Sequence, residues 1–368
     1  MIIKNSKKIA FIKYGGLASG GTEVSFQTLA KHLSETYEVD YYYCDPTPYI
    51  GWDYTHPPTD VFRKEYLTNS KVNIIKFNVE FKDVTVRTHD WVNTNFWELF
   101  NENQYSLILS TTAGPPEYPF IKITETPIIN ILTLNAGVSN QENICKTVLI
   151  SEFSQKQWIK GGGIEAKSIV IPLVREGIPK IEDDFRKELS LKNKFIFGFH
   201  QREDDNIFSN VPLKSYQKIE REDNFFLLLG GSLLYQKQAE ELKLKNFLRL
   251  DSSSDVKILN KFLNTLEVYT HGRKYGETFG LVLTEAMSYG IPLISHRAES
   301  NAQEEVIGEA GRVFNKSNIF SYSREMKKLQ NYPTYYEEIS KKSQRRFLKY
   351  YDNKTIIEKY SNLIQEFI

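Results

Sequence analysis

Runs of apolar residues divide the first part of the chain into short elements. Residues 8–14 and 39–44 are apolar-rich and bounded by polar residues, so they predict strands, and 23–33 has apolar residues near helical spacing. Further strands are predicted at 72–77, 107–110, 128–132 and 148–150. A strand, a glycine-rich turn, a helix and a second strand in succession predict a β-α-β unit and therefore a parallel sheet.

Two stretches lack a periodic pattern of apolar residues. Residues 45–70 carry Pro46, Pro48, Pro57 and Pro58, which predict a long irregular loop. Residues 172–194 carry two prolines and dense charge without a core pattern. We expect the connection between two domains there.

A second series of alternating elements follows this stretch. The pattern predicts strands at 195–199, 225–229, 247–250, 268–270 and 292–295, helices at 213–219, 256–263 and 280–288, and helical structure over 321–368. The chain is therefore predicted to be an α/β protein with two successive Rossmann-like, doubly wound parallel-sheet domains. Ligands bind such sheets at the carboxyl ends of the strands, so two halves that face each other would form one central cleft.

Composition agrees with two folded domains. The 368 residues are 40% apolar and 13% aromatic, enough for a sizeable core. The formal charge of +1 argues against a nucleic-acid binder, which needs a basic face. The two cysteines, Cys44 and Cys145, lie about 100 residues apart, which excludes a disulfide framework.

Localisation follows from weaker signals. No run approaches 18 apolar residues, so no transmembrane span is expected. The first residues lack the apolar region of a signal peptide. We expect a cytoplasmic protein with, at most, weak peripheral contact with a membrane.

The segment 271–295 carries the strongest chemical signal. A strand ends near His271, a turn holds Gly276, and a helix begins around Phe279 and ends at Gly290. Gly280 at the helix start allows a ligand to approach the backbone. Free amides and the positive end of the helix dipole favour a phosphate or a polar sugar there.

Two glutamates flank this helix start. Glu277 precedes the helix and Glu285 lies about two turns inside it. A carboxylate accepts two hydrogen bonds at once, which suits the vicinal hydroxyls of a sugar or a ribose. The alternative is that Glu277 only caps the helix and Glu285 lies on a solvated face.

The spacing resembles a known signature. Seven residues separate Glu277 from Glu285, and the segment includes the Phe-Gly pair, a Glu-Ala-Met triplet and Gly-x-Pro before the next strand. This resembles the E-x7-E signature of retaining GT-B glycosyltransferases, most closely glycosyltransferase family 4. The resemblance is strong over 266–314 and weak over 40–130.

The resemblance implies a GT-B domain organisation. Residues 1–174, joined by a C-terminal helix at about 354–368, would form an acceptor-side domain. Residues 190–353 would bind the nucleotide-sugar donor, and 175–189 would link the two domains.

The same resemblance assigns candidate site residues. Glu285 would hold the ribose hydroxyls and Glu277 the hydroxyls of the transferred sugar. The remaining candidates are backbone contacts. The amides of Phe279, Gly280 and Leu281 would face the sugar and diphosphate, the turn at Gly20 and Gly21 would close over the diphosphate, and the base would lie near Gly230, Gly231, Leu250 and Asp251.

The family usually neutralises the diphosphate with an arginine and a lysine a few residues later. Arg202 matches the arginine, but the next lysine is Lys214, which lies too far along the chain. Arg273 or Lys274 could replace that lysine. The alternative for Arg202 is a surface ion pair with the acidic run at 203–205.

Family members often support the donor sugar with a histidine of the first domain. His89, in a polar stretch, is the candidate catalytic histidine, whereas His32 falls in the first helix and fits a surface role. Contacts near the cleft are also expected from three polar stretches at strand ends, 111–114, 135–137 and 301–305. Aromatic clusters, including Tyr41 to Tyr43 and Trp97, are predicted to be core, and the basic run 341–346 a solvated helix face.

A metal and a separate cofactor are not expected. Metal-dependent glycosyltransferases typically use Asp-x-Asp, and no two of the 14 aspartates stand two apart. The sequence and the resemblance together predict a retaining, metal-independent glycosyltransferase that uses a UDP- or GDP-type donor and a glycan or other hydroxyl acceptor. The alternatives are a GT-B-shaped epimerase or phosphorylase, and a catalytically decayed nucleotide-sugar binding protein. A dehydrogenase fits poorly, because the first glycine turn lacks Gly-x-Gly-x-x-Gly.

Overall fold

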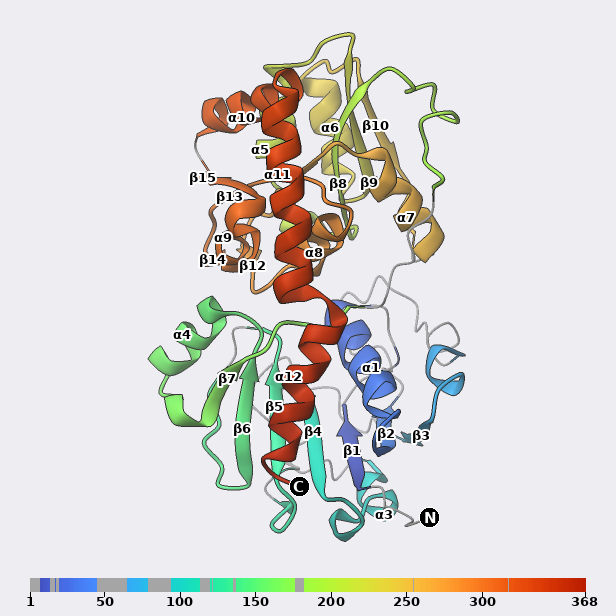
Figure 1. The fold of residues 1–368 in the computed structure, drawn as a ribbon, viewed down its shortest axis with the longest axis vertical. Coiled ribbons are helices and arrows are strands. Elements are labelled where there is room, and N and C mark those ends of the chain that lie inside the picture. Colours follow the sequence, from blue (N-terminus) through green and yellow to red (C-terminus); the bar gives the residue numbers. More distant parts are fainter. Residues whose placement is uncertain are drawn as a thin grey trace. The chain divides into compact units, whose positions relative to one another are not determined.

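A computed structural model describes most of the chain. The described residues are 7–13, 17, 20–44, 65–78, 94–112, 120, 122–134, 137–175, 182–253, 255–316 and 318–368. The chain divides into two compact units. Unit 1 comprises Met1–Glu176 and Asn353–Ile368, and unit 2 comprises Gly177–Asp352. Each unit is built around its own parallel sheet (Figure 1).

Unit 1 holds a seven-stranded sheet in the order β3-β2-β1-β4-β5-β6-β7. Its strands are β1 (Lys8–Ile12), β2 (Glu38–Cys44), β3 (Val72–Phe77), β4 (Leu107–Thr112), β5 (Ile128–Leu132), β6 (Ile144–Leu149) and β7 (Ser168–Val170). Every neighbouring pair is parallel. With β1 near the centre and the chain winding outward on both sides, this is the predicted doubly wound arrangement.

The helical elements described in unit 1 include α1 (Gly21–Leu33), α3 (Phe96–Leu99), η1 (Glu102–Gln104), α4 (Glu152–Lys160), η3 (Glu165–Lys167) and α12 (Asn353–Gln365). The prediction of an irregular loop over 45–70 is wrong at its end, because residues 65–68 are helical. Leu67 in that turn is fully buried in the core. Residues 45–64 lie outside the described part.

The two faces of the unit 1 sheet follow the alternation of its strands. Ile9 and Phe11 enter one apolar cluster, whereas Ala10 and Ile12 enter the cluster on the opposite face. Helices α1 and α12 lie together over the first face (Figure 1). α12 contributes its buried stripe of Ile356, Tyr360, Leu363 and Ile364 to that cluster.

Unit 2 holds a six-stranded parallel sheet in the order β10-β9-β8-β11-β13-β15. Its strands are β8 (Phe195–Gln201), β9 (Asn224–Gly230), β10 (Phe247–Leu250), β11 (Val268–Thr270), β13 (Leu293–His296) and β15 (Gly311–Phe314). Two further short strands, β12 (Gly276–Glu277) and β14 (Ser300–Asn301), pair beside the sheet. The predicted strands at 195–199, 225–229, 247–250, 268–270 and 292–295 are all confirmed, with ends that move by at most two residues.

The helical elements of unit 2 are η4 (Asp205–Ile207), α5 (Val211–Gln217), α6 (Leu234–Glu241), α7 (Val256–Thr265), α8 (Leu281–Ser288), α9 (Ala302–Ile307), η5 (Gly308–Ala310), α10 (Ile319–Asn331), α11 (Pro333–Arg346) and η6 (Phe347–Tyr351). The predicted helix at 280–288 is confirmed as α8. The helical stretch predicted from 321 onward is divided into separate helices, because Pro333 begins α11 directly after α10 ends.

Residues 184–186 are fixed to unit 2 by polar contacts. The Phe185 amide donates to Thr265 Oγ1 at 2.9 Å, and the Arg186 guanidinium pairs with Glu267. Both partners lie at or near the end of α7, so the chain is attached to unit 2 before β8 begins. Among the described residues, no helix combines the length and the apolar character that crossing a membrane requires.

The contribution of α12 to unit 1 can be measured. Leu363 is 1% exposed within the unit 1 cluster, so Leu363→Ala should lower the free energy of unfolding of this unit by about 2–5 kcal/mol. All four tryptophans lie in residues 1–176, so tryptophan fluorescence during urea unfolding reports on unit 1. Lys359→Ala, on the exposed face of the same helix, should change the midpoint little. An unchanged midpoint for Leu363→Ala would show that unit 1 does not depend on α12.

Candidate functional site

The candidate site lies at the carboxyl ends of three adjacent strands in unit 2. The sheet places β11 between β8 and β13. His200 lies near the end of β8, His271 directly follows β11, and His296 ends β13. The loops that leave these three strands carry most of the polar residues predicted to bind a ligand.

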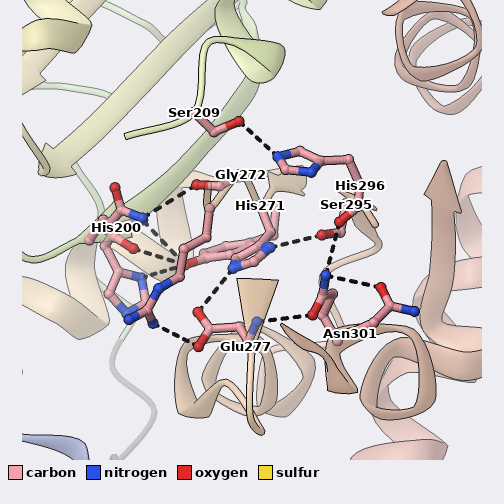
Figure 2. Close-up of polar contacts among 12 residues, drawn as sticks. His200, Ser209, His271, Gly272, Glu277, Ser295, His296 and Asn301 are labelled. Atoms are coloured by element: carbon pink, nitrogen blue, oxygen red, sulfur yellow. Dashed lines mark hydrogen bonds and ion pairs between the residues drawn. The ribbon is translucent and has the colours of Figure 1, made fainter. Parts of the chain in front are cut away.

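Glu277 is the most constrained carboxylate of this edge (Figure 2). Its Oε1 lies 3.2 Å from His271 Nε2, and its Oε2 accepts from Arg273 Nη1 at 2.7 Å. The residue is 9% exposed. Burial alone raises the pKa of this carboxyl, but the hydrogen bond from His271 and the charge of Arg273 outweigh it, so the pKa lies below its ordinary value. Glu277 is therefore a buried anion at neutral pH.

The backbone around Glu277 is fixed by the short β12–β14 pair. Gly276 has φ +74°, and a Cβ at this position would lie 1.7 Å from the Ser300 carbonyl oxygen, so only glycine fits. The Glu277 amide donates to Gln303 Oε1 at 3.0 Å, and Gln303 Nε2 donates to the His296 carbonyl at 3.0 Å. Glu277 is thus held by its main chain as well as by its side chain.

Glu285 is held by a second histidine. Its Oε2 lies 3.0 Å from His200 Nε2, and His200 Nδ1 lies 3.2 Å from the Tyr269 hydroxyl. Burial, helped by the charges of Glu285 and Glu277, raises the pKa of Tyr269 well above its ordinary value. Both glutamates therefore act electrostatically on one buried hydroxyl, which places them around a common region of unit 2.

The start of α8 has the geometry expected of a backbone ligand site. Gly280 occupies the N-cap position with φ +93° and ψ +76°, a left-handed conformation that favours glycine, and Leu281 is the first helical residue. Phe279 is 2% exposed, and its ring packs edge-on against Tyr351 at a centroid distance of 5.7 Å. Phe279 therefore anchors the turn through its buried ring.

Of the three candidate cations, the two arginines are paired with carboxylates. Arg202 follows β8, its side chain is 58% exposed, and its Nη2 contacts Asp204 Oδ2 at 2.7 Å. This is the ion pair with the 203–205 run that formed the alternative for Arg202. Arg273 lies within the Glu277 cluster, whereas Lys274 is exposed with its ammonium 5.0 Å from the Tyr275 ring centroid.

The other predicted donor-side positions surround a second turn. Gly230 and Gly231 have φ of +70° and +74°, and a Cβ on Gly230 would lie 2.4 Å from the Gln201 carbonyl oxygen. The Gly231 carbonyl accepts from the Arg249 guanidinium at 3.0 and 3.2 Å. These two glycines are therefore required by the turn itself. Leu250 ends β10 half-buried, and the Asp251 carboxylate is fully exposed.

The glycine turn of unit 1 begins α1. Gly20 is the N-cap and Gly21 the first helical residue. The buried Lys13 ammonium, just after β1, lies 3.1 Å from Glu23 Oε1 in the first turn of that helix. A Cβ on Gly20 would lie 2.3 Å from Glu23 Oε2, so the ion pair depends on glycine here or on movement of the carboxylate.

Several predicted residues cannot be placed. His89, residues 113 and 114, and Asn135 with Ala136 lie outside the described residues. Thr111 is buried in β4 and donates to the Ile131 carbonyl at 3.2 Å, so its hydroxyl is engaged within the sheet. His32 is exposed near the end of α1, as predicted for a surface residue, and Asn301 occupies the N-cap position of α9.

The aromatic clusters of unit 1 separate into two kinds. Tyr41, Tyr42 and Tyr43 are buried, as predicted for core residues. Phe96 is also core, but its neighbour Trp97 is half-buried and lines an open cavity of about 560 Å³ together with Lys122. The prediction that Trp97 belongs only to the core is therefore incomplete.

Sequence reasoning missed the partners of the two glutamates. His200, Tyr269 and Ser295 received no role, although each lies within a strand of the unit 2 sheet, and Gln303 was expected only as part of the 301–305 stretch. Polar residues at the carboxyl ends of the predicted strands were the available signal for His200 and Ser295. No group of three or more His, Cys, Asp or Glu suited to a metal occurs within the described part of the chain.

A buried serine–histidine pair lies near the site. Ser209 Oγ lies 2.7 Å from His296 Nε2, and His296 Nδ1 donates to the Arg297 carbonyl at 3.0 Å. Burial lowers the pKa of His296 to about 4, so the ring is neutral and accepts the serine proton. Ser209 and His296 are 2% and 1% exposed, which excludes a substrate from the serine. The pair connects the loop before α5 to β13.

Known proteins resemble this chain in a family model and in the fold. Residues 180–346 match the family model described as glycosyl transferases group 1. No curated protein matches the chain. Anabaena HepE in complex with UDP and glucose is 16% identical, with 98% of this chain and 100% of that chain covered and a TM-score of 0.73. A glycosyltransferase from Rickettsia africae is 13% identical, with 99% of each chain covered and a TM-score of 0.75. Sucrose-phosphate synthase from Thermosynechococcus elongatus is 14% identical, with 98% of each chain covered and a TM-score of 0.71. Both units are Rossmann-like, so the chain has the GT-B fold predicted for it, and residues 180–346 are similar to the glycosyl transferases group 1 model.

Proposed function

We propose that this protein is a retaining glycosyltransferase that moves a sugar from a nucleoside-diphosphate sugar to a hydroxyl acceptor such as a glycan. The observation that carries the proposal is the buried, ionised Glu277, held by His271 and Arg273 beside the start of α8. An ionised carboxylate only accepts hydrogen bonds, so Glu277 can bind sugar hydroxyls. Its position within the family match at 180–346 supports this role.

The donor would lie along α8. Glu285, two turns inside the helix, would accept from the ribose hydroxyls, and Glu277 would accept from the transferred sugar. The amides near Gly280 and Leu281, at the positive end of the helix, would face the diphosphate. UDP is the first nucleotide to test, because HepE, a protein of the same fold, is solved with UDP and with UDP-glucose.

Charge development at the leaving group sets the main catalytic requirement. The diphosphate gains negative charge as the glycosidic bond breaks, and fixed amides and cations that meet this charge lower the barrier. Arg273 is only partly exposed and uses Nη1 for Glu277, so the rest of its guanidinium can serve the phosphates. Arg202 would contribute after exchanging Asp204 for a phosphate oxygen.

Retention follows from attack on the face that the leaving group vacates. In this route a leaving phosphate oxygen takes the proton of the acceptor hydroxyl, and the donor carbon exchanges one oxygen substituent for another. No protein nucleophile is required. The reaction is proposed to be metal-independent, because the sequence lacks Asp-x-Asp and Arg202, Arg273 and the α8 amides supply positive charge.

Donor binding predicts a shift in thermal stability. A nucleotide sugar at 100 times its dissociation constant should raise the free energy of unfolding by about 2.7 kcal/mol. A panel of UDP, GDP, ADP and dTDP sugars, measured by dye-based thermal unfolding, should show one base series with a clear shift. Inorganic phosphate at the same concentration serves as the control. No shift with any nucleotide would contradict donor binding at this site.

Loss of the Glu277 charge should impair turnover. Glu277→Gln keeps the side-chain size but removes the anion, so transfer should fall by roughly 10²–10³-fold, measured as product by mass spectrometry. Glu309→Gln, the same chemical change at an exposed residue of unit 2, should keep the wild-type rate. Full activity of Glu277→Gln would refute the assigned role. A donor isomer formed without acceptor product would identify an epimerase, and donor binding without any product would identify a binding protein.

Metal independence is tested directly. Transfer by wild-type enzyme in excess EDTA should stay within twofold of the untreated rate, because protein cations and amides meet the leaving-group charge. Added Mg²⁺ or Mn²⁺ should not raise the rate of the EDTA-treated enzyme after desalting. Loss of activity in EDTA with recovery on adding a divalent ion would overturn this part of the proposal.

A further inference from the structure

Three of the six histidines of the chain lie at the carboxyl ends of three adjacent strands. His200 is near the end of β8, His271 follows β11, and His296 ends β13. Histidines placed side by side in this way can each fix a neighbouring group in one orientation. The hydrogen-bond partners of the three imidazole rings differ, and these partners indicate which group each ring holds in place.

His271 is fixed at both ring nitrogens. Its Nδ1 lies 2.8 Å from Ser295 Oγ and its Nε2 lies 3.2 Å from Glu277 Oε1, and the ring is buried (Figure 2). Because the Glu277 carboxylate is ionised and can only accept, Nε2 must carry the proton. Ser295 belongs to β13, so the ring is held by one strand while it orients a residue of β12.

His200 is fixed in the same manner. Its Nδ1 lies 3.2 Å from the Tyr269 hydroxyl and its Nε2 lies 3.0 Å from Glu285 Oε2. The Tyr269 hydroxyl also lies 3.1 Å from the His200 carbonyl oxygen, so its single proton is shared between that oxygen and Nδ1, and tyrosine on β11 holds both the ring and the main chain of His200. The side chains of His200 and Glu285 are 13% and 18% exposed, which leaves their pair at the edge of the core.

His296 provides the contrast. Both of its ring nitrogens are taken by groups that fold the loop, Ser209 and the Arg297 carbonyl. No glutamate is among those contacts. Burial at a strand end therefore does not by itself give a histidine a carboxylate partner, and the two glutamate contacts are particular to His200 and His271.

We propose that His200 and His271 are positioning residues, one for each glutamate of the E-x7-E pair: His200 orients Glu285 and His271 orients Glu277. This inference rests on the proposed function. Each carboxylate oxygen has two lone pairs, so a histidine can fix the rotamer and leave acceptor sites for the hydroxyls of a donor. A displacement of about 1 Å at a reacting group can cost on the order of 10²-fold in rate, so this orientation has kinetic consequences.

The two histidines should affect different kinetic constants. The ribose contact assigned to Glu285 is remote from the bond that breaks and is equal in the ground and transition states, so its loss raises KM. Glu277 contacts the sugar whose bonds change, so its misplacement lowers kcat. A loss of structure alone would not separate KM from kcat in this way.

The test compares a conservative and a disruptive variant at each position. His271→Leu should lower kcat by roughly 10–100-fold with the donor KM within about threefold of wild type. His200→Leu should raise the donor KM by roughly tenfold with kcat within about threefold. His271→Gln and His200→Gln retain an amide N–H that can donate to the carboxylate, and each should recover most of the loss. His32→Gln, on α1, is the matched control and should behave as wild type.

Two results would overturn the inference. One is a glutamine variant no more active than the leucine variant at the same position. The other is a parallel change in kcat and KM at both positions in variants whose thermal unfolding matches wild type. Thermal unfolding shows how much of each variant is folded, and kcat is calculated from the folded enzyme alone. A variant that fails to fold is therefore not mistaken for one that has lost positioning.

Failure of the proposed function is recognised separately. If wild-type protein transfers no sugar from any donor, the glycosyltransferase proposal fails, and ¹⁵N NMR of the histidine rings decides the positioning inference. Both rings should carry a proton on Nε2, and Glu277→Gln should shift only the His271 signal, whereas Glu285→Gln should shift only that of His200. An unprotonated Nε2 on either ring, or equal shifts in both variants, would refute the inference.

Discussion

The arrangement of unit 2 depends on one buried negative charge. Transfer of a carboxylate from water to a protein interior costs roughly several kcal/mol, even after the protein relaxes. A cation and hydrogen bonds to the carboxylate can offset this cost. Glu277 receives Arg273 on one oxygen and His271 on the other, and its pKa stays low although burial opposes ionisation. Both partners and Glu277 itself belong to the segment that directly follows β11.

That requirement explains features that otherwise look incidental. Gly276 allows β12 to approach β14 closely enough for Gln303, at the start of α9, to accept from the Glu277 amide. Gln303 then reaches back to the end of β13 through the His296 carbonyl. The short β12–β14 ladder therefore connects the turn that carries Glu277 to the main sheet. The contact between Ser209 and His296 in turn fixes the loop before α5 to the end of β13.

The sequence predicted the strands well, because buried parallel strands are continuous apolar runs. It also singled out Glu277, Glu285 and Gly280 as candidate site residues, because their spacing along the chain is local. It could not pair His271 with Ser295 or Glu277 with Gln303, since 24 and 26 residues separate these partners and only the tertiary fold brings them together. The sequence did not predict short elements such as β7 and α3, because three or four residues are too few to show a periodic apolar pattern.

The path of the chain has a consequence for the order of folding. Unit 1 is formed from residues at both ends of the sequence, and α12 supplies part of its core after all of unit 2 has been made. During translation unit 2 can therefore complete its contacts first, although it is encoded second. Until residues 353–368 leave the ribosome, the β1 face of unit 1 lacks the apolar stripe of α12. The nascent first domain must stay soluble through that interval, which makes it the stage at which a chaperone would be most needed.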